Sequence, residues 1–357
     1  MSKRITIKDI ASEAGISLGA AHYALSGQPG VSEETRARVL AIAKKHNYHA
    51  NRAAASLKRK TIKIAVVFPS IVGVNRFYLS YYWEGQRAYF NSIRDFNIQI
   101  IEKSFTLGEG NHSEIWTELE KHDVQGLLCA TGYMNEQDKE MIRQLAQDGL
   151  AIALVGEDLP DSEVLCCVQP NYDVIGRTVA ELLSRQMKEK RDVVVCAGQK
   201  NIPSHYEIVE GMTAYFSEHS SGSLVCCYEQ DMGTDGLQKE LKEVLDQVSA
   251  LGGCFSVTAR GSVALARALR SIKQREEIYA VGSDMFMENV LLLQEGIFTN
   301  LINKNPYAQA NKAARMLAEY LIRGTMPEKR VFYIGSEVVF QSSLPLYEEG
   351  SGSNIFL

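Results

Sequence analysis

The sequence predicts a small all-α domain at the N-terminus, followed by a larger two-lobed α/β domain. Helical spacing of apolar residues dominates the first 50 residues (the head), whereas strand-like and helical runs alternate over residues 62–347 (the body). Residues 1–63 hold twelve Lys/Arg against four Asp/Glu, a charge of +8, although the 357-residue chain carries −5. A basic head on an acidic body favours binding of a polyanion by the head.

Three short helices are predicted in the head. Polar residues typical of N-caps stand before each helix, and the expected N-caps are Thr6, Ser17 and Ser32. Apolar residues then recur at helical spacing over 7–14, 18–25 and 33 to about 46. Two short helices joined by a Gly-containing turn and closed by a third form a helix-turn-helix domain, whose second helix enters the major groove of DNA.

The segments that form this pattern match a known family closely. ITIKDIASEAGIS, VSEETRARVLAIAKKHNY and NRAAASL resemble the LacI/GalR (lactose-repressor-like) family of bacterial transcription regulators, without a gap from Thr6 to Leu57. The resemblance implies a ligand-responsive, sequence-specific transcription regulator of carbohydrate-related genes, and a repressor because most members repress. It implies a pseudo-palindromic operator in double-stranded DNA and a second copy of the chain, in a homodimer, as partners.

Residues 51–61 are expected to form the hinge helix and linker of this family. The alanine-rich run is too short to be a stable helix alone in water. In the family, paired hinge helices lie in the minor groove, where Leu57 would act as an apolar wedge between base pairs. The alternative is a core leucine, but the basic residues 58–60 directly after it favour the wedge and suit phosphate contacts.

The predicted recognition helix is unusually apolar. Leu18, Gly19 and Tyr23 stand where the family usually carries polar residues, so the bidentate donors that distinguish bases are missing. We therefore expect sequence readout to depend strongly on the hinge and on half-site spacing. The expected DNA-binding residues are Thr6, Ser17, Leu18, Gly19, His22, Tyr23, Ser26, Ser32, Asn51, Arg52, Ala54, Leu57 and Lys58.

The body alternates apolar runs with amphipathic stretches, which predicts two parallel sheets of about six strands each. Strands are expected at 62–68, 98–102, 125–130, 151–155, 193–197, 254–258 and 279–283. Helices are expected at 78–92, 112–121, 136–148, 173–188, 205–218, 234–246, 262–272 and 306–323. This part resembles the type I periplasmic-binding-protein fold that the same family carries.

The resemblance also gives the division of the body. Lobe 1 is expected at about 62–168 and 303–331, and lobe 2 at about 169–302 and 332–347. The chain should cross between the lobes near 168–170, 300–304 and 331–334. Residues 348–357, with the sequence GSGSNIFL at their end, are expected to be a disordered tail.

In this fold a ligand binds in the cleft between the lobes, at the carboxyl ends of the strands. The resemblance places Phe77 and Tyr78 where family aromatics stack on a sugar, with core packing as the alternative for both. Asp284 matches an Asp that accepts hydrogen bonds from sugar hydroxyls, with a loop cap as the alternative. The expected effector-binding residues are Asn75, Phe77, Tyr78, Glu157, Asn171, His205, Tyr206, Arg260, Asp284 and Lys304.

Three positions depart from the family pattern in this cleft. Ile208 stands where the family has an Arg, and Arg260 and Lys304 replace an Asn and a Gln. Two new cations would suit an anionic effector, such as a sugar phosphate or a sugar acid. Alternatively, Arg260 pairs with Asp284 or Glu157 and the cleft binds a neutral sugar.

Other classes of function have little support in the sequence. There is no P-loop, GxSxG, HExxH or paired-carboxylate pattern, so we expect no enzyme activity, no metal and no cofactor. A cytoplasmic protein without membrane contact is expected, because the chain has neither a signal-peptide pattern nor about 20 consecutive apolar residues. Its seven cysteines are expected to be reduced, buried thiols. The remaining alternative is a cytosolic sugar-sensing binding protein without a DNA role.

Overall fold

The structure of the protein is a computed structural model that describes residues 5, 7–26, 30–46, 61–106, 112–187, 189, 191–219, 222–229, 233–272 and 278–349. The chain divides into two compact units, one of which contains the head and the other nearly all of the body.

The head folds into three helices at the predicted places. They are α1 (Ile7–Ala14), α2 (Leu18–Ser26) and α3 (Glu33–Lys45). Local capping explains where α2 and α3 begin: the Ser17 Oγ accepts a hydrogen bond from the Ala20 N–H (3.1 Å), and the Ser32 Oγ accepts one from the Thr35 N–H (3.2 Å). The small core is built around Ile10, Ala14, Ala24 and Val39, all buried.

The body contains two six-stranded sheets, as the alternating pattern predicts. The first sheet has the order β11-β5-β4-β3-β1-β2 and the second the order β12-β10-β9-β8-β6-β7. We call the parts built on these sheets lobe 1 and lobe 2. The strands of lobe 1 are β1 (Ile62–Pro69), β2 (Ile98–Phe105), β3 (Gly126–Cys129), β4 (Ala151–Val155), β5 (Cys166–Pro170) and β11 (Val331–Ile334). Those of lobe 2 are β6 (Asp192–Cys196), β7 (Leu224–Cys227), β8 (Leu251–Ser256), β9 (Tyr279–Ser283), β10 (Asn300–Asn303) and β12 (Glu337–Val339).

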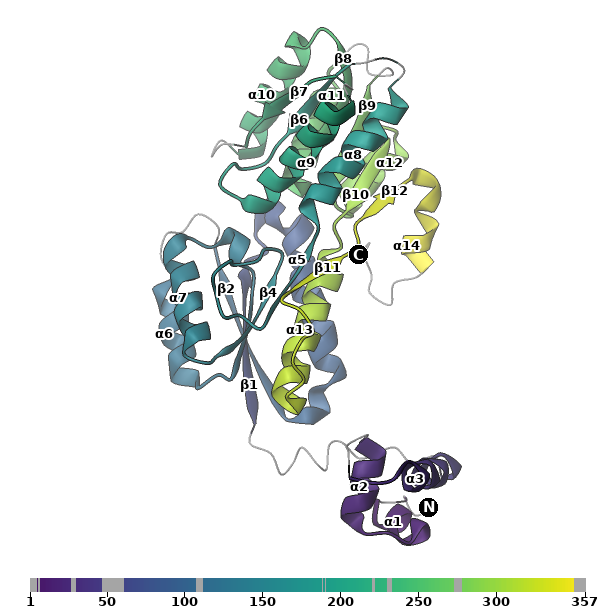
Figure 1. The fold of residues 1–357 in the computed structure, drawn as a ribbon. Coiled ribbons are helices and arrows are strands. Elements are labelled where there is room, and N and C mark those ends of the chain that lie inside the picture. The colour runs from purple at the N-terminus through teal and green to yellow at the C-terminus, as the bar shows by residue number, and fades with distance from the viewer. Residues whose placement is uncertain are drawn as a thin grey trace. The chain divides into compact units, whose positions relative to one another are not determined.

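Helices cover both faces of each sheet, which explains why the central strands are buried on both sides. In lobe 1, α6 (Ser113–His122) and α7 (Glu136–Gln147) lie on one face, and α5 (Arg76–Ser92) and α13 (Pro306–Arg323) on the other (Figure 1). In lobe 2, α8 (Tyr172–Gln186) and α9 (Pro203–His219) pack on one face. The other face carries α10 (Gly233–Gln247), α11 (Ala259–Leu269) and α12 (Met287–Gln294). A short helix, α14 (Pro345–Glu349), ends the described chain.

The chain passes between the two sheets three times. It leaves the first sheet after β5, returns after β10 by way of α13, and leaves again between β11 and β12. The third passage falls at residues 335–336, slightly later than the expected 331–334, because Val331 to Ile334 still pair with β5. β12 then runs antiparallel to β10, in contrast to the parallel pairs of the central strands of lobe 2.

Some elements were not predicted. The sequence pattern did not reveal the strands β5, β7, β10, β11 and β12 or the helix α12, which are all short. The cysteines form no disulfide in the described part of the chain; six are buried and Cys226 is half-buried. Among the described residues no helix is both long and apolar enough to cross a membrane.

Candidate functional site

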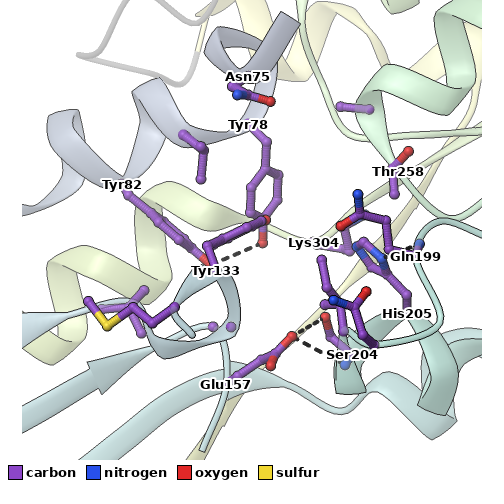
Figure 2. A pocket seen from close by; sticks show the side chains of 18 of the residues that line it. Asn75, Tyr78, Tyr82, Tyr133, Glu157, Gln199, Ser204, His205, Thr258 and Lys304 are labelled. Carbon is purple, nitrogen blue, oxygen red and sulfur yellow. Dashed lines mark hydrogen bonds between the residues drawn. The ribbon is translucent and has the colours of Figure 1, made fainter. Parts of the chain in front are cut away.

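A cavity of about 780 Å³ lies between lobe 1 and lobe 2. Its lining comes from segments that follow the carboxyl ends of strands in both sheets, the place where open α/β sheets bind ligands. Figure 2 shows tyrosine side chains from lobe 1 facing polar side chains that come mainly from lobe 2. The volume falls in the range typical of small-molecule sites.

One pair of buried charges lies at the back of this cavity. The Lys304 Nζ lies 3.0 Å from a carboxylate oxygen of Asp284, and both residues are buried. Lys304 also donates to the Val257 carbonyl (2.8 Å). Burial raises the pKa of Asp284, and the Lys304 ammonium opposes that rise. Asp284 follows β9 with a φ of 71°, a left-handed conformation that is rare outside glycine, so the site holds its backbone in a strained conformation.

A second ion pair is formed within lobe 2. The Arg260 Nε donates to a carboxylate oxygen of Glu229 (2.9 Å), and an Arg260 Nη and the Thr258 hydroxyl also donate to this carboxylate. Arg260 stands in the first turn of α11, whose N-cap is Thr258. Both cations expected beside the cleft thus line the cavity, and each one is already paired with a carboxylate.

Glu157 links the two lobes across the cavity. It follows β4 of lobe 1, and its Oε1 accepts hydrogen bonds from the Ser204 N–H (3.2 Å) and Oγ (2.5 Å) (Figure 2). Ser204 lies in the first turn of α9 in lobe 2. Burial raises the pKa of Glu157, although the two bonds from Ser204 favour its charged form. Gly132 leaves room for the carboxylate, because a Cβ there would lie 2.5 Å from the Glu157 Cδ.

His205 supplies a neutral imidazole to the cavity. Its Nδ1 lies 3.0 Å from the Gln199 backbone N, and accepts the hydrogen bond that this N–H donates. Burial first, and then the charge of Lys304, lower the pKa of His205 to about 3. At neutral pH the ring is therefore uncharged, and the proton is on Nε2, where it can be donated.

Tyrosines form the lobe 1 side of the cavity. Tyr78 and Tyr82 project from α5, and Tyr133 follows β3. The Tyr78 hydroxyl accepts a hydrogen bond from the Gln309 side chain (3.2 Å) and lies 3.4 Å from the Tyr82 hydroxyl. Burial raises the pKa of all three phenols, so they remain neutral donors.

The structure brings together seven of the ten expected effector-binding residues. The seven that line the cavity are Asn75, Tyr78, Glu157, His205, Arg260, Asp284 and Lys304. The Phe77 ring instead stacks on Phe286 of lobe 2, with 4.3 Å between the ring centroids. The Asn171 side chain caps α8 by accepting from the Val174 N–H, and Tyr206 is 51% exposed, outside the cavity lining.

Several lining residues were missed by sequence reasoning. They include Tyr82, Tyr133, Gln199, Ser204, Glu229 and Thr258. Glu229 follows β7, a strand that the sequence pattern did not reveal. Its position at the carboxyl end of a strand, where ligand-binding residues are expected, could therefore not be recognised. Among the described residues, no group of three or more His, Cys, Asp or Glu side chains is arranged to hold a metal ion.

The expected DNA-binding surface of the head lies on α2. Leu18 and Tyr23 are 45% and 43% exposed, and Gly19 is also exposed. Arg36 donates to the carbonyls of Tyr23 and Ala24 and so fixes α3 against the second half of α2. The side chains of His22 and Ser26 are not described, and Thr6, Asn51, Arg52, Ala54, Leu57 and Lys58 lie outside the described residues.

Two family models match this chain. The model described as "Bacterial regulatory proteins, lacI family" matches residues 6–51, and the model described as "Periplasmic binding protein domain" matches residues 117–325. The first match covers the head, and the second covers more than half of the chain, within the body.

Two individual relatives are similar to a part of this chain. Catabolite control protein A of Staphylococcus epidermidis is 24% identical over 218 residues, which are 60% of this chain and 62% of that protein. The sucrose operon repressor of Klebsiella pneumoniae is 26% identical over 185 residues, 48% of this chain and 54% of the repressor. The similarity therefore spans less than two thirds of the length of each relative.

A solved structure shows the fold of the body. A glucose–galactose binding protein from Geobacillus stearothermophilus superimposes with a TM-score of 0.70 at 17% identity. The match covers 81% of this chain and all of that protein.

Proposed function

Because the chain belongs to the lacI family of bacterial regulatory proteins and carries a periplasmic binding protein domain, we propose that it is a ligand-controlled, sequence-specific DNA-binding repressor of carbohydrate-related genes. The observation that carries this proposal is the combination of a basic three-helix head with a body that encloses a polar cavity between two lobes. Such a chain would act in the cytoplasm as a homodimer that places two heads on a pseudo-palindromic operator.

The head is proposed to bind the major groove through α2. Leu18 would contact a thymine methyl, Gly19 would permit close approach, and Tyr23 would offer one hydrogen bond. The remaining expected contacts, to phosphates and to the minor groove, stay as predicted from the sequence, with Leu57 as the wedge at the centre of the operator.

The effector is proposed to bind in the cavity between the lobes. Seven residues are its expected contacts: Asn75, Tyr78, Glu157, His205, Arg260, Asp284 and Lys304. Since Arg260 and Lys304 already neutralise Glu229 and Asp284, the cavity holds no surplus of positive charge for a phosphate or a sugar acid. Among the two alternatives that the sequence leaves open, the arrangement supports a sugar without negative charge.

Control of DNA binding is proposed to follow from lobe closure. Contacts such as Glu157 with Ser204 and Phe77 with Phe286 join the two lobes in this structure, and opening of the cleft would separate them. An effector that binds the closed form more tightly than the open form increases the population of closed chains. The hinge would transmit this change to the DNA-binding head, and the operator affinity could change at most by the ratio of the effector's affinities for the two forms.

The decisive test is a selection of duplexes from a random DNA pool by the full-length protein, followed by mobility-shift titration of the selected sequence. We expect a pseudo-palindrome, weaker binding by Leu57→Ala than by wild type, and a change in affinity when a sugar effector is added. The rival function, a sugar-sensing protein without a DNA role, predicts binding without sequence preference and without dependence on Leu57.

A further inference from the structure

Glu157 is a buried carboxylate of which only one oxygen accepts hydrogen bonds from the described residues. It is 9% exposed, and both hydrogen bonds that it accepts from Ser204 fall on Oε1. Within the described part of the chain, Oε2 has no hydrogen-bond partner and no cation forms an ion pair with this carboxylate. The side chain lines the cavity between the lobes (Figure 2).

The other charged groups around the cavity are matched with one another. Arg260 pairs with Glu229 and Lys304 with Asp284, while Lys139 lies 2.8 Å from a carboxylate oxygen of Glu136. His205 is neutral because burial lowers its pKa. The described lining therefore carries three cations against four carboxylates. Glu157 is the carboxylate that forms no ion pair there; the charge of Lys139, which pairs with Glu136, acts on it only at longer range.

We propose that the effector is a polyhydroxylated amine, such as an amino sugar, whose ammonium group binds the Oε2 of Glu157. This inference rests on the proposed function, because it takes the cavity as the effector site. An ammonium brings both a hydrogen-bond donor and the missing positive charge to a buried carboxylate. The hydroxyls of the same ligand would meet Asp284, the His205 Nε2–H and the tyrosines of lobe 1.

Neutral and anionic ligands use this site less completely. A hydroxyl group can donate to Oε2 but leaves the buried charge of Glu157 uncompensated. A phosphate or carboxylate would add negative charge to a lining that already has one carboxylate in excess.

The position of Glu157 also gives the amine a way to act on the lobes. Ser204 holds the carboxylate from lobe 2, while Gly132 gives it space in lobe 1. An ammonium on Oε2 stabilises the ionised carboxylate, and an ionised carboxylate is the better acceptor for the two Ser204 donors. Binding of the amine therefore strengthens a contact between the lobes and favours the closed form.

The test is calorimetric titration of the full-length protein with matched ligands. D-glucosamine, D-galactosamine and D-mannosamine are compared with their parent hexoses and with the 6-phosphates of those hexoses. At least one amine should bind about ten- to a hundredfold more tightly than its parent, the range of a charge-assisted hydrogen bond, and the phosphates should bind most weakly. Glu157→Gln should abolish the preference for the amine over its parent sugar, while Glu163→Gln, at an exposed position outside the cavity lining, should retain it.

Clear outcomes overturn the inference. It fails if no amine binds, if a parent hexose binds as tightly as its amine, or if Glu157→Gln, with an unchanged thermal unfolding midpoint, keeps the preference. Operator binding is measured separately, first without ligand. If operator binding responds only to a neutral sugar, the proposed function stands and the amine effector is rejected. If the protein binds an amine but recognises no operator, the amine site stands and the proposed function is rejected.

Discussion

The head and the cleft hold their expected functional side chains in opposite ways. In the head, Leu18 and Tyr23 are largely exposed on a single helix whose folding depends on neighbouring caps and a small core. In the cleft, residues far apart in the sequence meet, and charged side chains form pairs such as the buried pair of Lys304 with Asp284. A substitution on the exposed face of the head should therefore change DNA binding without changing stability. In the cleft the same contacts are expected to serve both ligand binding and stability.

The largest effect is expected at the buried ion pair. Lys304→Met leaves the Asp284 carboxylate buried without its cation and should lower the free energy of unfolding by about 3–5 kcal/mol. Urea unfolding followed by tryptophan fluorescence measures this, because both tryptophans, Trp83 and Trp116, lie in the body. Adding Asp284→Asn should recover most of the loss; an unchanged midpoint for Lys304→Met alone would contradict the coupling of charge and stability in the cleft.

A pH dependence is expected from His205. Its folded pKa of about 3 lies below the unfolded value of about 6.5, so the unfolded chain binds more protons between these values. The stability contributed by the neutral ring is complete above pH 6.5 and is lost as the pH falls toward 3. His205→Gln should reduce the loss between pH 6.5 and 5 by about 1–2 kcal/mol, measured by urea unfolding at each pH. If the free energy of unfolding depends on pH in the same way for both proteins, the pKa of His205 is not lowered by folding.

The stacked pair that joins the lobes should affect ligand affinity. Phe286→Ala removes the ring on which Phe77 stacks and should weaken effector binding about tenfold, since such pairs contribute about 0.5–1.5 kcal/mol beyond burial. A double-mutant cycle with Phe77→Ala, measured by calorimetry, isolates the pair. Phe340→Ala, at a 48% exposed phenylalanine, is the matched control. Additive effects of the two changes would mean that this contact does not stabilise the closed form.

The smallest effect on stability is expected on the recognition helix. Leu18→Ala removes a side chain that is 45% exposed and should change the free energy of unfolding by less than about 0.5 kcal/mol. The same change should lower operator affinity, as measured by mobility shift, because Leu18 is an expected base contact. A large loss of head stability would show that Leu18 belongs to the core, and would remove the contrast with the cleft.

Local patterns predicted the head well because its structure depends on neighbours in the sequence. Ser17 and Ser32 cap the helices that follow them, and Gly15 adopts the left-handed φ of 66° that ends α1. The strands of the body that are long and apolar were also predicted, since burial on both faces requires continuous apolar runs. Short strands such as β7 were missed because four residues carry too little pattern.

The partners within the cleft could not be predicted in this way. Arg260 and Lys304 were expected at the cleft because they match cleft positions of the LacI/GalR family. That Arg260 would pair with Glu229, and not with Asp284 or Glu157, depended on a strand that the pattern did not reveal. Phe77 and Tyr78 are neighbours in the sequence, yet one stacks on the other lobe and only the other lines the cavity.

The sequence by itself determined the two units, the three helices of the head, the alternating order of the body and most of the residues that meet in the cleft. The two units, the helices of the head and the order of the body follow from periodicity and capping, which are local properties of the chain. The cleft residues were expected from the resemblance of the sequence to the LacI/GalR family. The tertiary structure alone decided which charges neutralise each other and which carboxylate remains unmatched. Pairing energies depend on distance and burial, and only folding brings Glu157, Ser204 and the paired cations around one cavity.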